Sequence, residues 1–244
     1  MFSQTINRFV KGVTNFAAKH STKVKGSGSV KSETHRQPPF KKVVLKVPAT
    51  ATVVVSAGVN EITIIAPENL HQYLKMRVRG SELVIDKTRE FDVNDVSEIR
   101  IEIKVPQPLK GFVVFGSGVV NTSDAAVIEK TVTVDVNGSG KINLAMDSST
   151  EIVANVFGSG GITIDGSVAH IRGSVNGSGS LNFKKVICDS AKVDVYGSGS
   201  IEVFASKDLN ADMFGSGNIF YYGNPRVKSS VKGSGKIVHN NSNN

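Results

Sequence analysis

One tripeptide recurs through this chain at nearly constant intervals. Gly-Ser-Gly occurs eight times, with first glycines at Gly26, Gly116, Gly138, Gly158, Gly177, Gly197, Gly215 and Gly233. From Gly116 onward the interval stays between 18 and 22 residues. A period of about twenty residues, in a sequence without helix-forming composition, is typical of a β-solenoid in which each repeat forms one coil. The repeat therefore limits the fold more than any other feature of the chain.

Two columns of apolar residues flank the tripeptide, two positions before its first glycine and four positions after it. They are Val114, Val136, Val156, Val175, Val195, Met213 and Val231, and then Val120, Ile142, Ile162, Leu181, Ile201, Ile219 and Ile237. Alternate side chains of a strand point to opposite faces, and both columns share the parity of the two glycines, so this parity predicts the interior. The serine between the glycines is predicted to point outward.

The paired glycines are predicted to be structural. A Cβ at these positions would crowd the neighbouring coil, or the corner of the coil needs a positive φ. The set comprises Gly116, Gly118, Gly138, Gly140, Gly158, Gly160, Gly177, Gly179, Gly197, Gly199, Gly215, Gly217, Gly233 and Gly235.

We predict an all-β fold, namely a single-stranded right-handed parallel β-helix (β-solenoid) with a short N-terminal amphipathic helix. An antiparallel sandwich is the alternative, because it also has short strands with regular turns, but it would not place one tripeptide seven times in the same parity frame. The predicted organisation is an amphipathic helix at 1–20, a basic linker at 21–37, the β-helix domain at 38–238 and a disordered tail at 239–244. Further strands are predicted at 43–47, 53–55, 62–65, 83–85 and 99–105, with one helical turn within 67–74.

The basic character of the chain is concentrated at its N-terminus. The net charge is +8, but residues 1–50 hold ten Lys or Arg and one acid, Glu33, and the remainder is close to neutral. A nucleic-acid reader would carry its basic stripe on the folded part, so this partner is disfavoured. Residues 1–20 are predicted to cap the solenoid, to anchor it to an anionic membrane surface or to act as a targeting sequence. They lack a secretory signal, which favours an intracellular or peripheral membrane location.

No group of residues in the sequence predicts catalysis, a cofactor or a metal site. The five His residues are scattered singly, and Cys188 lies alone in an apolar run that predicts a buried thiol. Small polar residues stand three positions before the tripeptides, at Asp135, Asn155, Ser174, Asp194, Asp212 and Ser230. We interpret this column as a hydrogen-bonding ladder, or alternatively as carboxylates for a sugar or cation. A polysaccharide lyase or hydrolase on the same fold is the alternative function, because fold alone does not exclude an enzyme.

The residue immediately before each tripeptide is predicted to point outward. This column reads Phe115, Asn137, Phe157, Asn176, Tyr196, Phe214 and Lys232. Outward rings either pack under a loop, the N-terminal helix or a second subunit of a homo-oligomer, or form a platform for an extended ligand. We predict Phe115, Phe157, Tyr196 and Phe214 as the binding residues of an interaction module whose partner is a carbohydrate, a protein or an anionic membrane surface.

The order of features in the non-repeated half adds a resemblance to a known family. These features are Gly26-Ser27-Gly28-Ser29-Val30, Glu33, Arg36, Phe40, the strand at 51–55, Gly58, the strand at 62–66, Asn69-Leu70, Tyr73 and Val105-Pro106 before the repeats. From about residue 26 to residue 238 the chain resembles the auto-transporter adhesin head GIN domain family. The resemblance implies a single-stranded right-handed β-helix and an adhesive or surface role.

Overall fold

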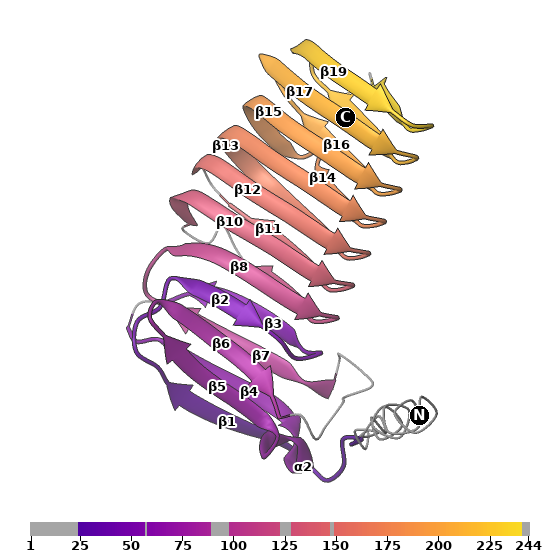
Figure 1. Cartoon of the computed structure of the whole chain (residues 1–244). Helices are drawn as coiled ribbons and strands as arrows, with labels where there is room; N and C mark the ends of the chain where they lie inside the picture. The colour runs from indigo at the N-terminus through magenta and orange to yellow at the C-terminus, as the bar shows by residue number, and fades with distance from the viewer. Residues whose placement is uncertain (1–23, 57, 89–97, 123–127, 147–148, 241–244) are drawn as a thin grey trace, which may run out of the picture.

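The chain forms a β-solenoid of about six turns (Figure 1). The computed structural model describes residues 24–56, 58–88, 98–122, 128–146 and 149–240. About 71% of the chain is strand, which confirms the all-β class. The amphipathic helix predicted at 1–20 and the tail residues 241–244 lie outside the described residues, and the right-handed winding stays a prediction.

The strands predicted from apolar runs are present, together with two that the sequence did not reveal. The non-repeated half contains β1 (Val30–Arg36), β2 (Lys42–Leu45), β3 (Thr50–Val55), β4 (Glu61–Pro67), α2 (Glu68–His71), β5 (Leu74–Arg79), β6 (Glu82–Lys87) and β7 (Arg100–Val105). The helical turn predicted within 67–74 corresponds to α2. The strand β1 lies inside the segment predicted as a basic linker, and β5 was not predicted.

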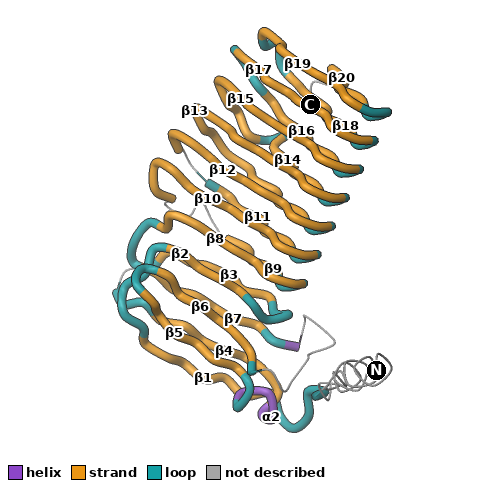
Figure 2. Tube along the Cα trace, in the orientation of Figure 1, coloured by secondary structure: helices purple, strands orange, loops and turns teal. Residues whose placement is uncertain are grey.

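The repeats supply the remaining strands, which alternate between two sides of the solenoid. They are β8 (Leu109–Gly116), β9 (Val119–Thr122), β10 (Ile128–Gly138), β11 (Lys141–Ala145), β12 (Ser149–Gly158), β13 (Gly161–Gly177), β14 (Ser180–Phe183), β15 (Val186–Gly197), β16 (Ser200–Phe204), β17 (Asp208–Gly215), β18 (Asn218–Tyr222), β19 (Arg226–Lys232) and β20 (Lys236–His239). The Gly-Ser-Gly turns line up along one edge of the solenoid (Figure 2).

Two sheets form the walls of the solenoid. The front sheet runs in the order β5, β6, β2, β8, β10, β12, the later part of β13, β15, β17 and β19. The back sheet runs β1, β4, β7, β3, β9, β11, the first part of β13, β14, β16, β18 and β20. In the repeats, equivalent positions pair in parallel register, as Val136 does with Val156 and Ile142 with Ile162. Each repeat position therefore forms a straight column along the axis.

The non-repeated half departs from a simple parallel coil. The coil made by β2 and β3 inserts between the coil of β6 and β7 and that of β8 and β9. Three pairings are antiparallel, namely β1 with β4, β4 with β7 and β5 with β6. The expectation of parallel strands throughout is therefore wrong for this end of the solenoid.

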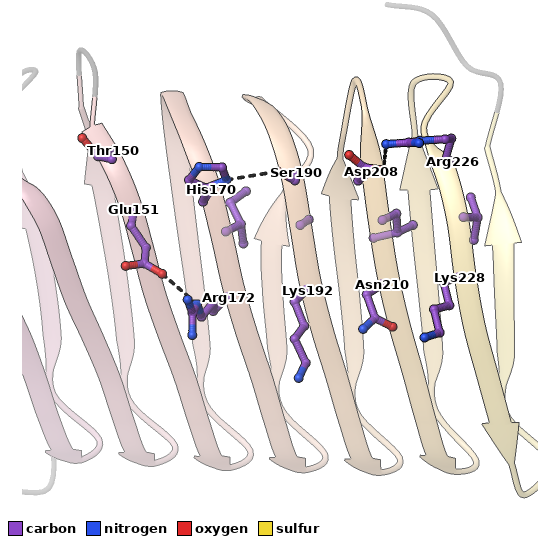
Figure 3. A pocket seen from close by; sticks show the side chains of 14 residues that line it. Thr150, Glu151, His170, Arg172, Ser190, Lys192, Asp208, Asn210, Arg226 and Lys228 are labelled. Carbon is purple, nitrogen blue, oxygen red and sulfur yellow. Dashed lines mark hydrogen bonds and ion pairs between the residues drawn. The ribbon is translucent and has the colours of Figure 1, made fainter.

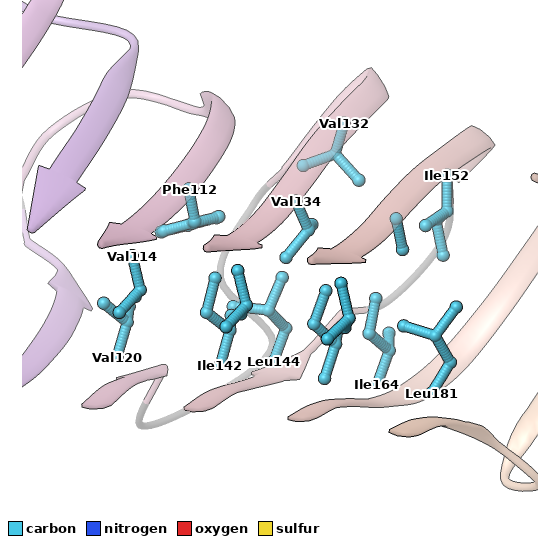
Figure 4. Packing of buried hydrophobic residues seen from close by; sticks show 14 of the residues in the cluster. Phe112, Val114, Val120, Val132, Val134, Ile142, Leu144, Ile152, Ile164 and Leu181 are labelled. Carbon is cyan, nitrogen blue, oxygen red and sulfur yellow. The ribbon is translucent and has the colours of Figure 1, made fainter. Parts of the chain in front are cut away.

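The two predicted apolar columns form the interior (Figure 4). In both columns every member before the last coil is at most 1% exposed. They belong to one continuous hydrophobic cluster that also includes the non-repeated half. The last coil differs, since Val231 is 46% exposed and no strand of the described residues pairs beyond β19 and β20. The parity prediction is thus confirmed, with an exception at the open end.

The preceding coil leaves no room for a Cβ at Gly158 or Gly160, and Gly158, the first glycine of its tripeptide, also needs a positive φ. The first adopts positive φ, as at Gly158 with φ of 121°, and its carbonyl accepts backbone N–H groups of the next turn. The second has no positive φ, but a Cβ on Gly160 would lie 2.4 Å from the Gly140 carbonyl oxygen and 2.5 Å from a methyl group of Val136. A Cβ on Gly158 would also lie 2.6 Å from the Gly138 carbonyl oxygen, so both explanations hold for the first glycine, and close packing alone accounts for the second.

Candidate functional site

The predicted aromatic column lies on the outer surface of the front sheet. Phe115, Phe157 and Tyr196 are 42%, 47% and 46% exposed, and Phe214 is half-buried. We call Phe115, Phe157, Tyr196 and Phe214 the aromatic stripe. Tyr196 and Phe214 stack with ring centroids 4.9 Å apart and planes inclined by 2°. Their outward orientation is confirmed, and the described residues do not cover the stripe. Their role in binding stays a prediction.

A lysine flanks the aromatic stripe at each end. The Lys46 ammonium lies 5.3 Å from the centroid of Phe115, and the Lys232 ammonium lies 5.5 Å from that of Phe214. Such cation–π contacts are worth about 0.5–1 kcal/mol at exposed sites. They orient the terminal rings and give both ends of the stripe a positive charge.

The polar column next to the stripe forms part of the predicted ladder. The Asn155 side-chain amide donates to an Asp135 carboxylate oxygen at 2.8 Å, and that of Asn176 donates to the Ser174 hydroxyl at 3.0 Å. Further along, Asp194 and Asp212 are in register on neighbouring strands. Burial raises the pKa of Asp194, and Asp212 raises it further, whereas Lys192 lowers it. The column thus presents amide and carboxylate groups beside exposed rings.

A shallow hollow of about 940 Å³ lies near the opposite edge of the front sheet (Figure 3). Two ladders in register across adjacent strands contribute to its lining. The rim ladder comprises Glu151, His170, Ser190, Asp208 and Arg226, and the cation ladder comprises Arg172, Lys192, Asn210 and Lys228. The sequence pattern did not predict either ladder. The rim ladder stands seven positions and the cation ladder five positions before the first glycine of each tripeptide.

Most charges of the rim ladder are neutralised within the hollow. Glu151 pairs with Arg172 at 2.7 Å, and Asp208 pairs with Arg226 at 2.8 Å. The ring of His170 lies 3.0 Å from the Ser190 hydroxyl. Two acids stand against four Lys or Arg residues, so the hollow as a whole is positive.

Cys188 lacks the environment of a catalytic thiol. It is buried, and its Sγ donates to the Phe204 carbonyl oxygen at 2.8 Å. Burial, with a smaller contribution from the Asp189 charge, raises the pKa of the Cys188 thiol to about 12. Within the described ranges, no three His, Cys, Asp or Glu side chains gather closely enough to hold a metal ion.

Native Cys188 is therefore expected to resist alkylation. With a pKa near 12, roughly one thiol in ten thousand is ionised at pH 8, and the thiolate is the reactive form. We expect no iodoacetamide adduct in native protein after an exposure that fully labels guanidinium-unfolded protein, as measured by intact mass spectrometry. Rapid labelling without unfolding would show that this part of the solenoid is open to solvent.

The geometry described so far defines a β-solenoid with an exposed aromatic stripe and a positive hollow on the same sheet. A family model described as "Putative auto-transporter adhesin, head GIN domain" matches residues 39–225, so the chain belongs to this family. The family assignment agrees with the resemblance drawn from the sequence. No curated protein matches the chain closely enough to count as a relative.

Several solved structures share the fold. A structure named a putative adhesin from Bacteroides fragilis is 19% identical, with a TM-score of 0.82 over 88% of this chain and 99% of that one. A structure named a putative lipid binding protein from Parabacteroides distasonis is 22% identical, with a TM-score of 0.72 over 90% and 100%. A putative adhesin from Parabacteroides merdae is 19% identical, with a TM-score of 0.74 over 89% and 99%. Among the described residues, no helix has the length and apolar character needed to cross a membrane.

Proposed function

We propose that the protein is a non-catalytic, adhesin-like binding module that holds an extended carbohydrate chain along its aromatic stripe. The observation that carries this proposal is the exposed stack of Tyr196 and Phe214 in line with exposed Phe157. Aromatic faces are apolar and flat, so they suit the C–H faces of sugar rings. Leaving three such rings in water is unfavourable unless a ligand or partner covers them.

The neighbouring polar groups support a carbohydrate over a lipid. The column beside the stripe offers the amide of Asn155 and the carboxylates of Asp194 and Asp212, which accept or donate hydrogen bonds to hydroxyl groups. A lipid chain would desolvate these groups without giving them partners, at a cost of about 1–3 kcal/mol each. Lipid binding, which the name of one structural neighbour suggests, is therefore the competing outcome of the experiment below.

The direction of the bound chain follows from the solenoid. Adjacent strands lie about 4.8 Å apart, so Phe157 and Tyr196, on strands two apart, are separated by about 10 Å along the axis. A ligand in contact with both must be extended and parallel to the axis. Longer oligosaccharides are therefore expected to bind more tightly than disaccharides.

The test is to replace Phe157, Tyr196 and Phe214 by Ser in one variant and to measure binding on an array of neutral glycans. Each stacked ring contributes about 0.5–1.5 kcal/mol beyond its buried area, so the triple variant should lose at least tenfold in affinity. Its circular dichroism should remain that of the wild type, because the rings lie outside the core. Its melting temperature should fall by no more than about 10 °C, because only the Tyr196–Phe214 stack and the Lys232 contact are lost.

The matched control is Phe220→Ser, which removes an outward ring from the back sheet. It should bind glycans as the wild type does. The proposal fails if the triple variant binds glycans unchanged or loses its fold, or if the wild type binds neutral phospholipid vesicles instead of glycans. New reducing ends in a bound glycan after incubation would point to the enzyme alternative.

A further inference from the structure

The cation ladder carries positive charge that no ion pair among the described residues fully neutralises. Arg172 pairs with Glu151, but among the described residues neither Lys192 nor Lys228 forms an ion pair with a carboxylate. Both lysines are exposed and line the hollow. Asp194, on the same strand, interacts electrostatically with Lys192, but the two side chains do not form a salt bridge. Two ammonium groups thus remain available to a negatively charged ligand.

The solenoid sets the interval between these charges. Lys192 is in register with Asn210, and Asn210 with Lys228, so the lysines stand two strands apart. This separation is roughly 10 Å along the axis. The four side chains of the ladder lie in a row across β13, β15, β17 and β19 (Figure 3). A complementary ligand is linear, with negative charges at a regular interval and hydrogen-bonding groups between them.

We propose that the cation ladder is a second binding site, separate from the aromatic stripe, for an extended acidic polysaccharide with one carboxylate or sulfate group per disaccharide. Lys192 and Lys228 bind successive anionic groups. The amide of Asn210, on the strand between them, bonds to the hydroxyls of the intervening sugar. Arg172 extends the site by one strand while it remains paired with Glu151.

The acidic groups around the hollow favour this ligand over other polyanions. Asp194 and Asp212 stand on the same strands as Lys192 and Asn210, between the cation ladder and the aromatic stripe. Single-stranded nucleic acid binds by stacking its bases on rings while cations hold its phosphates. A nucleic-acid strand that used both the aromatic stripe and the cation ladder would bring its phosphates close to the carboxylates of Asp194 and Asp212. A polysaccharide that follows the cation ladder alone avoids this repulsion.

The test uses hyaluronan oligosaccharides, which carry one carboxylate per disaccharide, with isothermal titration calorimetry on the full chain. Charge-assisted contacts are lost when Lys192 and Lys228 are replaced by Gln, so affinity should fall roughly tenfold for each substitution. Lys192 and Lys228 stand far enough apart for the effects of the two substitutions on affinity to multiply. Binding should also weaken as salt rises, because the groups are exposed.

Matched controls distinguish binding at the cation ladder from non-specific attraction to positive charge and from binding at the aromatic stripe. Lys141→Gln with Lys236→Gln removes two exposed charges from the back sheet and should leave hyaluronan binding unchanged. The triple Ser variant of the aromatic stripe should also bind hyaluronan as the wild type does, even if it loses neutral glycans. Loss of hyaluronan binding in that variant would overturn the separation of the two sites.

A gain of function completes the test. Asn210→Lys places a third unpaired cation between Lys192 and Lys228 and should strengthen binding to densely sulfated dextran relative to neutral dextran. The proposal is overturned if hyaluronan does not bind, or if K192Q/K228Q binds it as tightly as the wild type. It is also overturned if oligo-dT or phosphatidylserine vesicles bind more tightly than hyaluronan through the same two lysines.

Discussion

Replacement of Val175 by Asp is expected to break the solenoid into two independently melting parts. Val175 is fully buried in the interior column of the front sheet, where its neighbours are apolar. A buried carboxylate without a partner costs about 4 kcal/mol or more, which places it among the most damaging single substitutions. Because each coil contacts only its neighbours, a defect in a middle coil also uncouples the coils on either side.

The same substitution at Val231 provides the control. Val231 occupies the equivalent repeat position but is 46% exposed in the last coil. Val231→Asp is therefore expected to change stability by less than about 1 kcal/mol. Differential scanning calorimetry should show one transition for the wild type and Val231→Asp, and a broadened or split transition at lower temperature for Val175→Asp. Equal melting curves for the two variants would contradict the assignment of the interior.

The repeated half could be predicted from the sequence because identical coils stack on one another. Once the parity of the column at Val136 and Val156 is known, parallel stacking gives every coil the same interior. The non-repeated half offered no such rule. The apolar run of β2 is compatible with many neighbours, and nothing in it indicates that β2 pairs with β6 on one side and β8 on the other.

The strand β1 illustrates what sequence patterns miss. All seven of its residues are exposed, so it lacks the alternation by which strands are recognised. Its strand conformation follows from pairing with β4, from the hydrogen bond between the Thr34 and Thr63 hydroxyls at 2.9 Å and from the ion pair of Lys31 with Glu68. Each of these partners lies at least 25 residues away in sequence, as Glu61 does from Arg36, and local periodicity carries no information at that range.

The candidate sites divide in the same way. The aromatic stripe could be predicted because rings are conspicuous at a position whose parity points outward. The cation ladder could not be predicted, because the column seven positions before each tripeptide mixes acids, bases and neutral polar residues. The column five positions before it holds bases and an Asn, and the sequence does not show which of these bases are neutralised. Only the register shows that Glu151 neutralises Arg172 and that Asp208 neutralises Arg226, while Lys192 and Lys228 have no carboxylate partner within the described part of the chain.

The adjacent glycines 160 and 161 allow a sharp test of the coil corner. Gly160→Ala would place a Cβ 2.4 Å from the Gly140 carbonyl oxygen and 2.5 Å from a Val136 methyl group. The carbonyl belongs to the backbone of the preceding coil, so the clash is relieved only if two coils move apart. Overpacking of this kind costs roughly 3 kcal/mol, at the upper end of the usual range, which lowers the melting temperature by about 6–12 °C in a chain of this size.

Gly161→Ala should not lower the melting temperature, although it adds the same methyl group at the next residue. Its nearest neighbour would be the Ser180 hydroxyl at 3.2 Å, which can rotate, and no positive φ is required there. Alanine also restricts the unfolded chain, a stabilisation of about 0.4–1 kcal/mol where the backbone is compatible. In thermal melts followed by circular dichroism, Gly160→Ala should therefore have a lower melting temperature than the wild type. The melting temperature of Gly161→Ala should equal that of the wild type or exceed it. If Gly160→Ala melts with the wild type, the second glycine of the tripeptide is not a packing requirement, and the close approach of successive coils cannot explain why the tripeptide recurs.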